Sequence, residues 1–202
     1  IGVGLDRTDG TIEGGTFIGG AVGILASSGP RGLKITDSDI RKARTAMRFA
    51  PGQQGQVEVS GAKLRDNIDG VIVASGTDAV VSNAEIIGSS GAAAGIYGGG
   101  MRFESNTINS AAIGILVETP DALRPLEHLP PELTGFEHHQ ESAEIVRYRP
   151  AIVKDNTIQG VGVGIQLNRR AGAVVTGNSV EHAGKCIAGG SWWHRDGDNI
   201  CH

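Results

Sequence analysis

The sequence has few aromatic residues and no long apolar run. Phe, Trp and Tyr together make up 4% of its 202 residues, although a globular core of this size usually relies on more aromatic bulk. No stretch approaches the roughly eighteen consecutive apolar residues that a transmembrane helix needs, so we expect no contact with the membrane interior. A narrow interior filled by stacked aliphatic side chains does not need aromatic bulk.

An excess of positive charge is also missing. The chain has 18 Lys and Arg against 22 Asp and Glu, which gives a net charge of -4. Proteins that bind nucleic acid usually carry a basic surface, so we expect no nucleic-acid partner. Residues 1–10 lack the basic and apolar regions of a signal peptide and read as the middle of a repeat, which indicates a mature or trimmed fragment.

What the sequence does contain is an internal repeat of about twenty-two residues. An apolar residue closes each short polar turn, at steps of 22, 24, 22, 22, 50 and 22 residues: Ile18, Ile40, Leu64, Ile86, Ile108, Ile158 and Val180. Five residues before these anchors lie Glu13, Ile35, Val59, Val81, Phe103, Val153 and Val175. Seven residues after them lie Leu25, Met47, Val71, Ala93, Ile115, Ile165 and Ile187.

Three apolar columns at one period predict three short strands in each turn of a coil. In the two weak places, we expect Ile12 to substitute for Glu13 and Ile96 for Ala93. The fold expected is therefore an all-β parallel β-helix of about eight rungs, forming a single domain over residues 1–202. Each strand is too short to be stable alone, and stacking at about 4.8 Å per rung gives it backbone partners.

Asparagines mark the corners of the later rungs. Asn106, Asn156 and Asn178 each precede an anchor by two residues. Asparagine tolerates the left-handed backbone conformation of a sharp corner, and stacked asparagines can hydrogen-bond to one another as a ladder. The corners of this chain are therefore expected to carry such a ladder.

This pattern, Val-x-x-Asn-x-Ile followed by a polar turn and Gly-Ile-x-Leu, resembles the right-handed parallel β-helix repeat of the pectate lyase-like superfamily. The resemblance runs from Gly2 to about Ile187. It implies a fold and not a single activity, because the superfamily includes lyases, hydrolases, epimerases, tailspikes and adhesins. It also implies that strands such as 164–167 form the substrate groove.

Strand alternation on that groove sheet places one set of side chains on the outer face: Arg48, Tyr97, Leu116, Glu118, Gln166 and Asn168. From this set we take Tyr97, Gln166 and Asn168 as candidate substrate-binding residues. An ordinary solvated sheet face is the alternative.

The long step in the repeat is an insertion at about 118–149. Loops of this length in compact arrays are usually functional. His138 and His139 lie in it among several glutamates, and such groups supply general acids, general bases or metal ligands. We take the two histidines as candidate catalytic residues. The alternative is a charged loop that caps exposed rung edges.

The next two rungs carry unusual residues at the equivalent edge. Arg169 and Arg170 follow one strand, and Trp192, Trp193 and Arg195 follow the next. Indole rings beside guanidinium groups suit sugar rings with acidic substituents. The arginine pair is a candidate for catalysis, and the other three residues are candidates for substrate binding. Alternatively, the tryptophans belong to a terminal cap at 188–202 that shields the open end of the coil.

Cys186 and Cys201 are the only cysteines. They form either a disulfide that ties down the last turn, as in exported proteins, or a pair of free thiols. With the resemblance, this pair indicates a protein that is secreted, periplasmic, or on a cell or virion surface.

The resulting hypothesis is a carbohydrate-active protein that acts on an acidic polysaccharide with lyase- or epimerase-like chemistry. That chemistry needs a cation beside the uronate carboxylate and a base for the neighbouring proton. No cofactor is required, although Ca²⁺ is an alternative to the arginines; a homo-oligomer is compatible with the sequence. The competing hypothesis is a noncatalytic glycan-binding, adhesive or spike-type protein. The motifs of the polygalacturonase-like hydrolases are missing, which disfavours a hydrolase with two carboxylates.

Overall fold

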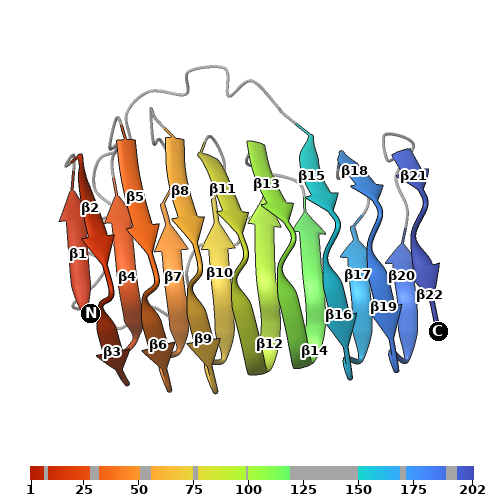
Figure 1. Cartoon of the computed structure of the whole chain (residues 1–202), viewed down its shortest axis with the longest axis horizontal. Helices are drawn as coiled ribbons and strands as arrows, with labels where there is room; N and C mark the ends of the chain where they lie inside the picture. Colours follow the sequence, from red (N-terminus) through yellow and green to blue (C-terminus); the bar gives the residue numbers. More distant parts are fainter. Residues whose placement is uncertain are drawn as a thin grey trace.

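The computed structural model describes residues 1–6, 9–27, 32–50, 56–74, 77–98, 100–118, 150–168, 172–189 and 195–202. All regular structure within these ranges is β-strand, and the strands pair in parallel. They lie side by side along the long axis of the molecule, with the two ends of the chain at opposite ends of the array (Figure 1). No helix in these ranges has the length and hydropathy to cross a bilayer.

The first stack is a sheet of eight strands. It consists of β2 (Gly10–Glu13), β5 (Gly32–Thr36), β8 (Gln56–Ser60), β11 (Asp78–Ser82), β13 (Gly100–Glu104), β15 (Ala151–Lys154), β18 (Ala173–Thr176) and β21 (Arg195–Gly197). β13 pairs directly with β15. The rungs on either side of residues 119–149 are therefore neighbours, as an insertion between two rungs requires.

The second and third stacks together form a sheet of fourteen strands. The second stack contains β3 (Thr16–Ile18), β6 (Asp39–Arg41), β9 (Lys63–Arg65), the first part of β12 (Glu85–Tyr97), the first part of β14 (Thr107–Glu118), β16 (Thr157–Gln159), β19 (Ser179–Glu181) and β22 (Ile200–Cys201). The third contains β1 (Val3–Asp6), β4 (Val22–Ser27), β7 (Thr45–Phe49), β10 (Asp69–Val73), the later parts of β12 and β14, β17 (Val163–Leu167) and β20 (Lys185–Gly189).

Each turn of the coil takes one strand from each stack, and the described chain makes about seven turns. β1 belongs to a partial turn at the start, and β21 and β22 to another at the end. The all-β parallel β-helix with three short strands per rung is confirmed, with about seven full turns in place of about eight rungs. The arrangement is consistent with the right-handed form that the resemblance implied.

The three apolar columns are confirmed in register, with two local corrections. In the first rung, Phe17 and not Ile18 pairs with Ile40, and Ile18 is 68% exposed. The assignment was wrong by one residue there. The same shift moves the other two columns to Ile12, as expected, and to Ile24 in place of Leu25.

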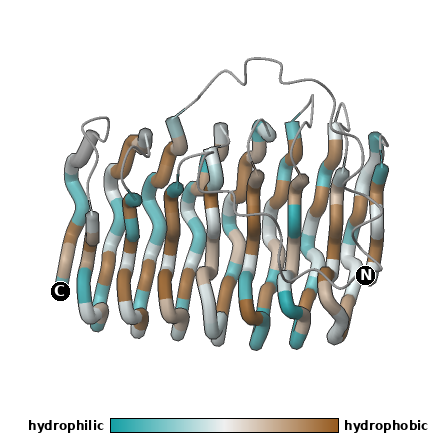
Figure 2. The backbone as a smooth tube through the Cα atoms, turned by 180° about the vertical axis from the view of Figure 1, so that it is seen from behind, coloured by the Kyte–Doolittle hydropathy of each residue, from teal (hydrophilic) through white to brown (hydrophobic). Residues whose placement is uncertain are grey.

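The second correction lies in β12. The pairing of β12 with β14 shifts between Ser89 and Ala92, so β12 has one extra residue after its corner. Ala94 therefore takes the place expected for Ala93 or Ile96. Ile96 is buried as well, but it pairs with Val73, two residues further along the strand. Hydrophobic segments recur at equivalent places on successive turns (Figure 2).

The asparagine ladder is confirmed, and its side chains lie inside the coil. The Nδ2 of Asn106 donates to Oδ1 of Asn156 at 3.1 Å, and that of Asn156 donates to Oδ1 of Asn178 at 2.9 Å. The ladder continues to Asn199 at 2.8 Å. Asn156 Nδ2 also donates to the carbonyl of Phe103 at 2.9 Å. Each side chain therefore satisfies backbone groups that the corner withdraws from the strand pairing.

The left-handed residue of each corner is the one before the asparagine, contrary to expectation. Positive φ angles occur at Ser105 (55°), Asp155 (53°) and Gly177 (66°). The left-handed residue turns the chain, and this turn aims the next side chain inward. The asparagines are therefore explained by hydrogen bonding in the interior and not by backbone tolerance.

Replacing Asn156 by alanine is expected to lower the free energy of unfolding by about 3 kcal/mol, because it leaves the buried N–H of Asn106 and the carbonyl of Phe103 without partners. Urea denaturation measures the change. Ser89→Ala is the matched control: Ser89 is 3% exposed and its Oγ has no hydrogen-bond partner among the described residues. This control should cost nothing or stabilise the fold, and equal losses in both variants would contradict a role for the ladder.

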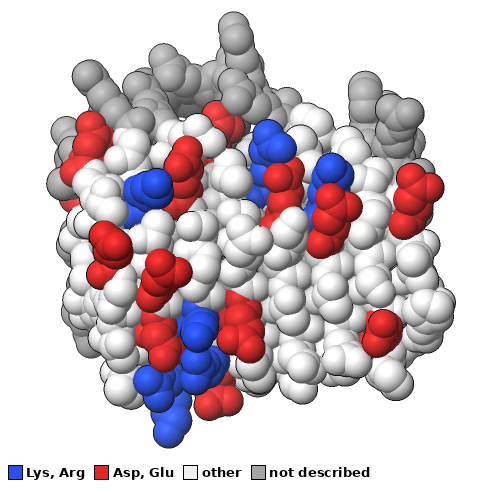
Figure 3. Space-filling model, viewed as in Figure 1, with Lys and Arg blue, Asp and Glu red and all other residues white. Residues whose placement is uncertain are grey.

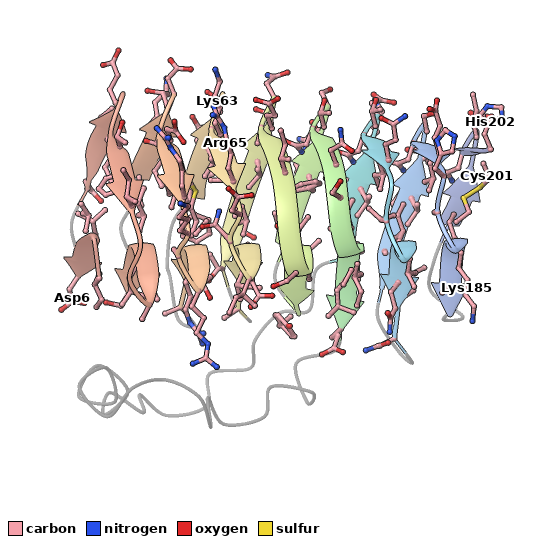
Figure 4. All side chains as sticks on the ribbon, turned by 90° about the horizontal axis from the view of Figure 1, so that it is seen from below. Asp6, Lys63, Arg65, Lys185, Cys201 and His202 are labelled. Atoms are coloured by element: carbon pink, nitrogen blue, oxygen red, sulfur yellow. A yellow bond between two sulfur atoms is a disulfide. The ribbon has the colours of Figure 1, made fainter. Side chains whose placement is uncertain are left out.

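Cys186 and Cys201 form a disulfide between β20 and β22, seen as the yellow bond beside Cys201 (Figure 4). Cys201 pairs with Val180 and so continues the aliphatic column of the second stack. Cys186 lies one rung beyond Gly164, and a Cβ on Gly164 would lie 2.6 Å from Cγ1 of Val180. Cys186 and Cys201 therefore lie one rung beyond Gly164 and Val180, and the disulfide takes the place of the contact between those two positions.

The double variant Cys186→Ser, Cys201→Ser is expected to lower the free energy of unfolding of the C-terminal rung by about 3 kcal/mol. Without the disulfide, the unfolded chain regains the conformational entropy that closing a loop of about fifteen residues removes. Because neighbouring rungs are coupled only to each other, amide protection should fall first in β20 and β22. Protection in β8 to β13 should stay unchanged. Hydrogen exchange measures both, and uniform loss along the coil would contradict a local role.

Candidate functional site

The outer side of the third stack carries rows of side chains that run parallel to the long axis. Strand pairing fixes the central row as Leu25, Arg48, Ile72, Gly95, Leu116, Gln166 and Ala188. Successive members are separated by about 4.8 Å, the spacing of paired strands. Two residues further along the strands, Tyr97, Glu118 and Asn168 form a parallel row.

The structure brings together three of the candidate binding residues, Tyr97, Gln166 and Asn168. All three are half-buried. Gln166 Nε2 donates to Oδ1 of Asn168 at 3.2 Å, and Asn168 Nδ2 donates to Oε1 of Glu118. These bonds hold the amide group of Gln166 in β17, and that of Asn168 just after it, against the end of β14. The role of the three residues in binding stays a prediction.

The other candidate residues are not brought to this face by the described chain. His138, His139, Arg169, Arg170, Trp192 and Trp193 lie outside the described residues. Arg195 begins β21 and pairs with Val174, so its strand belongs to the first stack. The first and third stacks are different sides of the coil.

Asp69 is the residue that the sequence did not reveal. It begins β10 between Thr45 of β7 and Ala92 of β12, so its carboxylate lies between two small, uncharged side chains. The backbone N–H of Ala92 donates to its Oδ1 at 3.2 Å. A Cβ on Gly91 would lie 2.4 Å from that oxygen, so glycine leaves the space for the carboxylate.

Burial raises the pKa of Asp69 above its ordinary value of 3.8. The hydrogen bond from Ala92 and the positive charges of Arg44 and Arg48 act in the opposite direction. The net effect is a carboxylate that holds its proton more firmly than usual, even though two guanidinium groups lie within electrostatic range.

Tyr97 shares this environment. Burial, followed by the negative charges of Glu118 and Asp69, raises its pKa above 10.0, while Arg48 lowers it. The phenol therefore stays protonated and can donate a proton. Asp69, Arg48 and Tyr97 come from three successive rungs and influence one another's charge, which is the kind of arrangement that concentrates at functional sites.

A second group of charges lies on the second stack. Lys and Arg side chains gather with Asp and Glu around β6 and β9 (Figure 3), and Lys63 and Arg65 point away from their strand (Figure 4). Asp39 forms ion pairs with Arg41 at 3.1 Å and Arg65 at 3.9 Å. These charges neutralise one another.

The described ranges hold no group of three or more His, Cys, Asp or Glu side chains that would suit a metal ion. The acidic segment that suggested calcium lies outside them. An open polar pocket lined by Asn83, Ala84, Glu85, Ser105 and Thr107 lies where the first stack turns into the second. It is remote in the fold from the rows of the third stack.

Comparisons of the chain with protein-family models, curated proteins and solved structures found no match. The candidate site therefore rests on the geometry and charge of its own residues.

Replacing Asp69 by asparagine is expected to stabilise the fold at pH 7. Because the folded pKa of Asp69 is raised, stability is lost as the pH rises through that pKa. Asparagine keeps an oxygen for the N–H of Ala92 and carries no charge. Urea denaturation at several pH values should show a gain at neutral pH that disappears below the ordinary value of 3.8. A variant less stable than the parent at neutral pH would contradict the raised pKa.

Proposed function

We propose that this protein binds an acidic polysaccharide along the outer side of the third stack and acts on it as a lyase or epimerase. The observation that carries the proposal is the coupled set of Asp69, Arg48 and Tyr97, in which burial raises the pKa of both the carboxyl and the phenol. The resemblance to pectate lyase-like repeats supports the same sheet as the binding surface.

The rows suit an extended ligand. A glycan chain that runs along the axis passes one rung for about each sugar unit, and it meets the half-buried Arg48, Tyr97 and Leu116 in turn. The phenol ring offers a face for a sugar ring, and the aliphatic neighbours exclude water around it. Beyond them, Gln166 and Asn168 offer amide groups that their mutual hydrogen bond already orients. An oriented group loses less entropy on binding than a free one.

The charged groups suit proton removal beside a uronate carboxylate. Arg48 neutralises that carboxylate, which makes the neighbouring carbon acid stronger. Asp69 in its ionised form takes the proton from this carbon, and its raised pKa makes it a better base. In a lyase, the electron pair left on the carbon forms a double bond as the glycosidic C–O bond breaks, and Tyr97 gives its proton to the leaving oxygen. In an epimerase, Tyr97 returns a proton to the opposite side of the same carbon.

The proposal keeps the chemistry expected from the sequence and assigns it to described residues. The sequence alone assigned the cation to Arg169 or Arg170 and the base to His138 or His139. Trp192, Trp193 and Arg195 remain proposed contacts for the same ligand. The disulfide at the C-terminal rung supports an oxidising compartment, so a secreted, periplasmic or surface location is part of the proposal.

The alternative is a noncatalytic glycan-binding protein of an adhesive or spike type. The half-buried Leu116 beside the preoriented Gln166 and Asn168 favours it, because binding needs contact area and hydrogen bonds but no perturbed acid or base. The two functions share one surface, so both predict that a glycan binds there.

A panel of acidic polysaccharides, assayed with and without calcium, separates these functions. Lyase activity appears as ultraviolet absorbance of unsaturated products, and epimerase activity as exchange of the uronate C–H proton for deuterium from heavy water. We expect Asp69→Asn to lower either rate by about 100-fold and to leave retardation in glycan affinity gels nearly unchanged. A dependence of either readout on calcium would indicate the metal.

The control is Asp78→Asn, which changes an aspartate at the start of β11 in the first stack and should leave both readouts unchanged. Binding without product in the parent protein would favour the adhesive alternative. If no acidic polysaccharide is bound or altered, the proposal fails.

A further inference from the structure

Gly95 lies beneath the aromatic ring of the candidate site. A Cβ built on Gly95 would lie 3.0 Å from Cε2 of Tyr97 and 3.4 Å from its Oη. It would also lie 2.8 Å from Cδ1 of Ile72. Tyr97 therefore folds back over the sheet, toward the central row, and fills the space that a side chain at position 95 would take.

The backbone does not explain the glycine. Gly95 is not among the residues with positive φ, so any residue could adopt its conformation. A glycine inside a strand weakens it, because glycine loses more conformational freedom on folding than other residues. In the central row, the neighbouring strands carry Ile72 and Leu116 at this position. Glycine at position 95 thus destabilises β12, and the packing of the Tyr97 ring into the space of the missing side chain explains why it is there.

We propose that Gly95 is the positioning residue of this site: its missing side chain lets the ring of Tyr97 lie along the sheet, against Ile72 and between Arg48 and Glu118. The inference rests on the proposed function for its meaning, because a flat ring next to these charges serves as a sugar platform and proton donor. A side chain at position 95 lifts the ring away from the sheet and into water.

The phenol itself reports its position. Tyr97 and Tyr148 are the only tyrosines in the sequence, so a Tyr148→Phe background leaves one phenol to titrate by ultraviolet absorbance. In this background we expect a pKa above 10.0, because burial and then the charge of Glu118 disfavour the phenolate. Adding Gly95→Ala should bring the pKa down toward 10.0, because the ring becomes more hydrated.

Two further variants keep the test specific. Ile72→Val removes the Cδ1 atom that the new Cβ would meet, so the combination with Gly95→Ala leaves the ring of Tyr97 as the main obstacle and should show the same fall in pKa. Gly10→Ala is the matched control, since a Cβ on Gly10 meets nothing within 4 Å; it should leave the titration unchanged. Circular dichroism verifies the β-structure of each variant.

The outcomes for Gly95 and for the proposed function are distinguishable. If the phenol titrates alike with and without Gly95→Ala in both the parent and the Ile72→Val background, the positioning role is wrong, whatever the protein binds. If the pKa falls, the role stands even where no polysaccharide binds. For a polysaccharide that does bind, we expect Gly95→Ala to weaken affinity or turnover by about tenfold; an unchanged value would mean that the flat ring is not needed.

Discussion

Parallel hydrogen bonding between successive rungs fixes nearly everything else in this structure. Each strand pairs in register with the equivalent strand of the next turn, so a residue's place within its rung decides which residues lie above and below it. Side chains that point inward are forced into columns at the spacing of paired strands. A narrow interior then accepts aliphatic side chains of similar size, which explains how a chain with few aromatic residues fills its core.

At the corners and at the C-terminal end, strand pairing is incomplete, and side chains supply the missing contacts. At a corner the backbone leaves the regular pairing, and Asn106, Asn156 and Asn178 supply the missing partners from inside the coil. At the C-terminal end the apolar column stops, and the disulfide between Cys186 and Cys201 continues the interior contact covalently. Both devices stabilise places where stacking alone gives a strand too few neighbours.

Outward side chains do not have to fill the narrow interior of the coil. The residue types on the outer side can therefore differ from rung to rung. On the second stack, Asp39, Arg41 and Arg65 neutralise one another in an exposed network. On the third stack, Asp69 and Tyr97 are partly withdrawn from water, so their mutual interactions are less screened and their pKa values shift. The stacking thus makes a rigid support on which groups from several rungs act together.

The sequence by itself determined the rungs, because an inward position must be apolar in every turn and the period is therefore visible in the order of residues. It also placed the asparagine ladder and put Tyr97, Gln166 and Asn168 on one face. Phe17 was missed because Ile18 beside it is equally apolar, and Ala94 because one extra residue in β12 shifts the count without changing composition. Only the tertiary structure decided that Asp69 joins Arg48 and Tyr97. These residues are more than twenty positions apart in sequence, and burial and charge become shared only once the rungs stack.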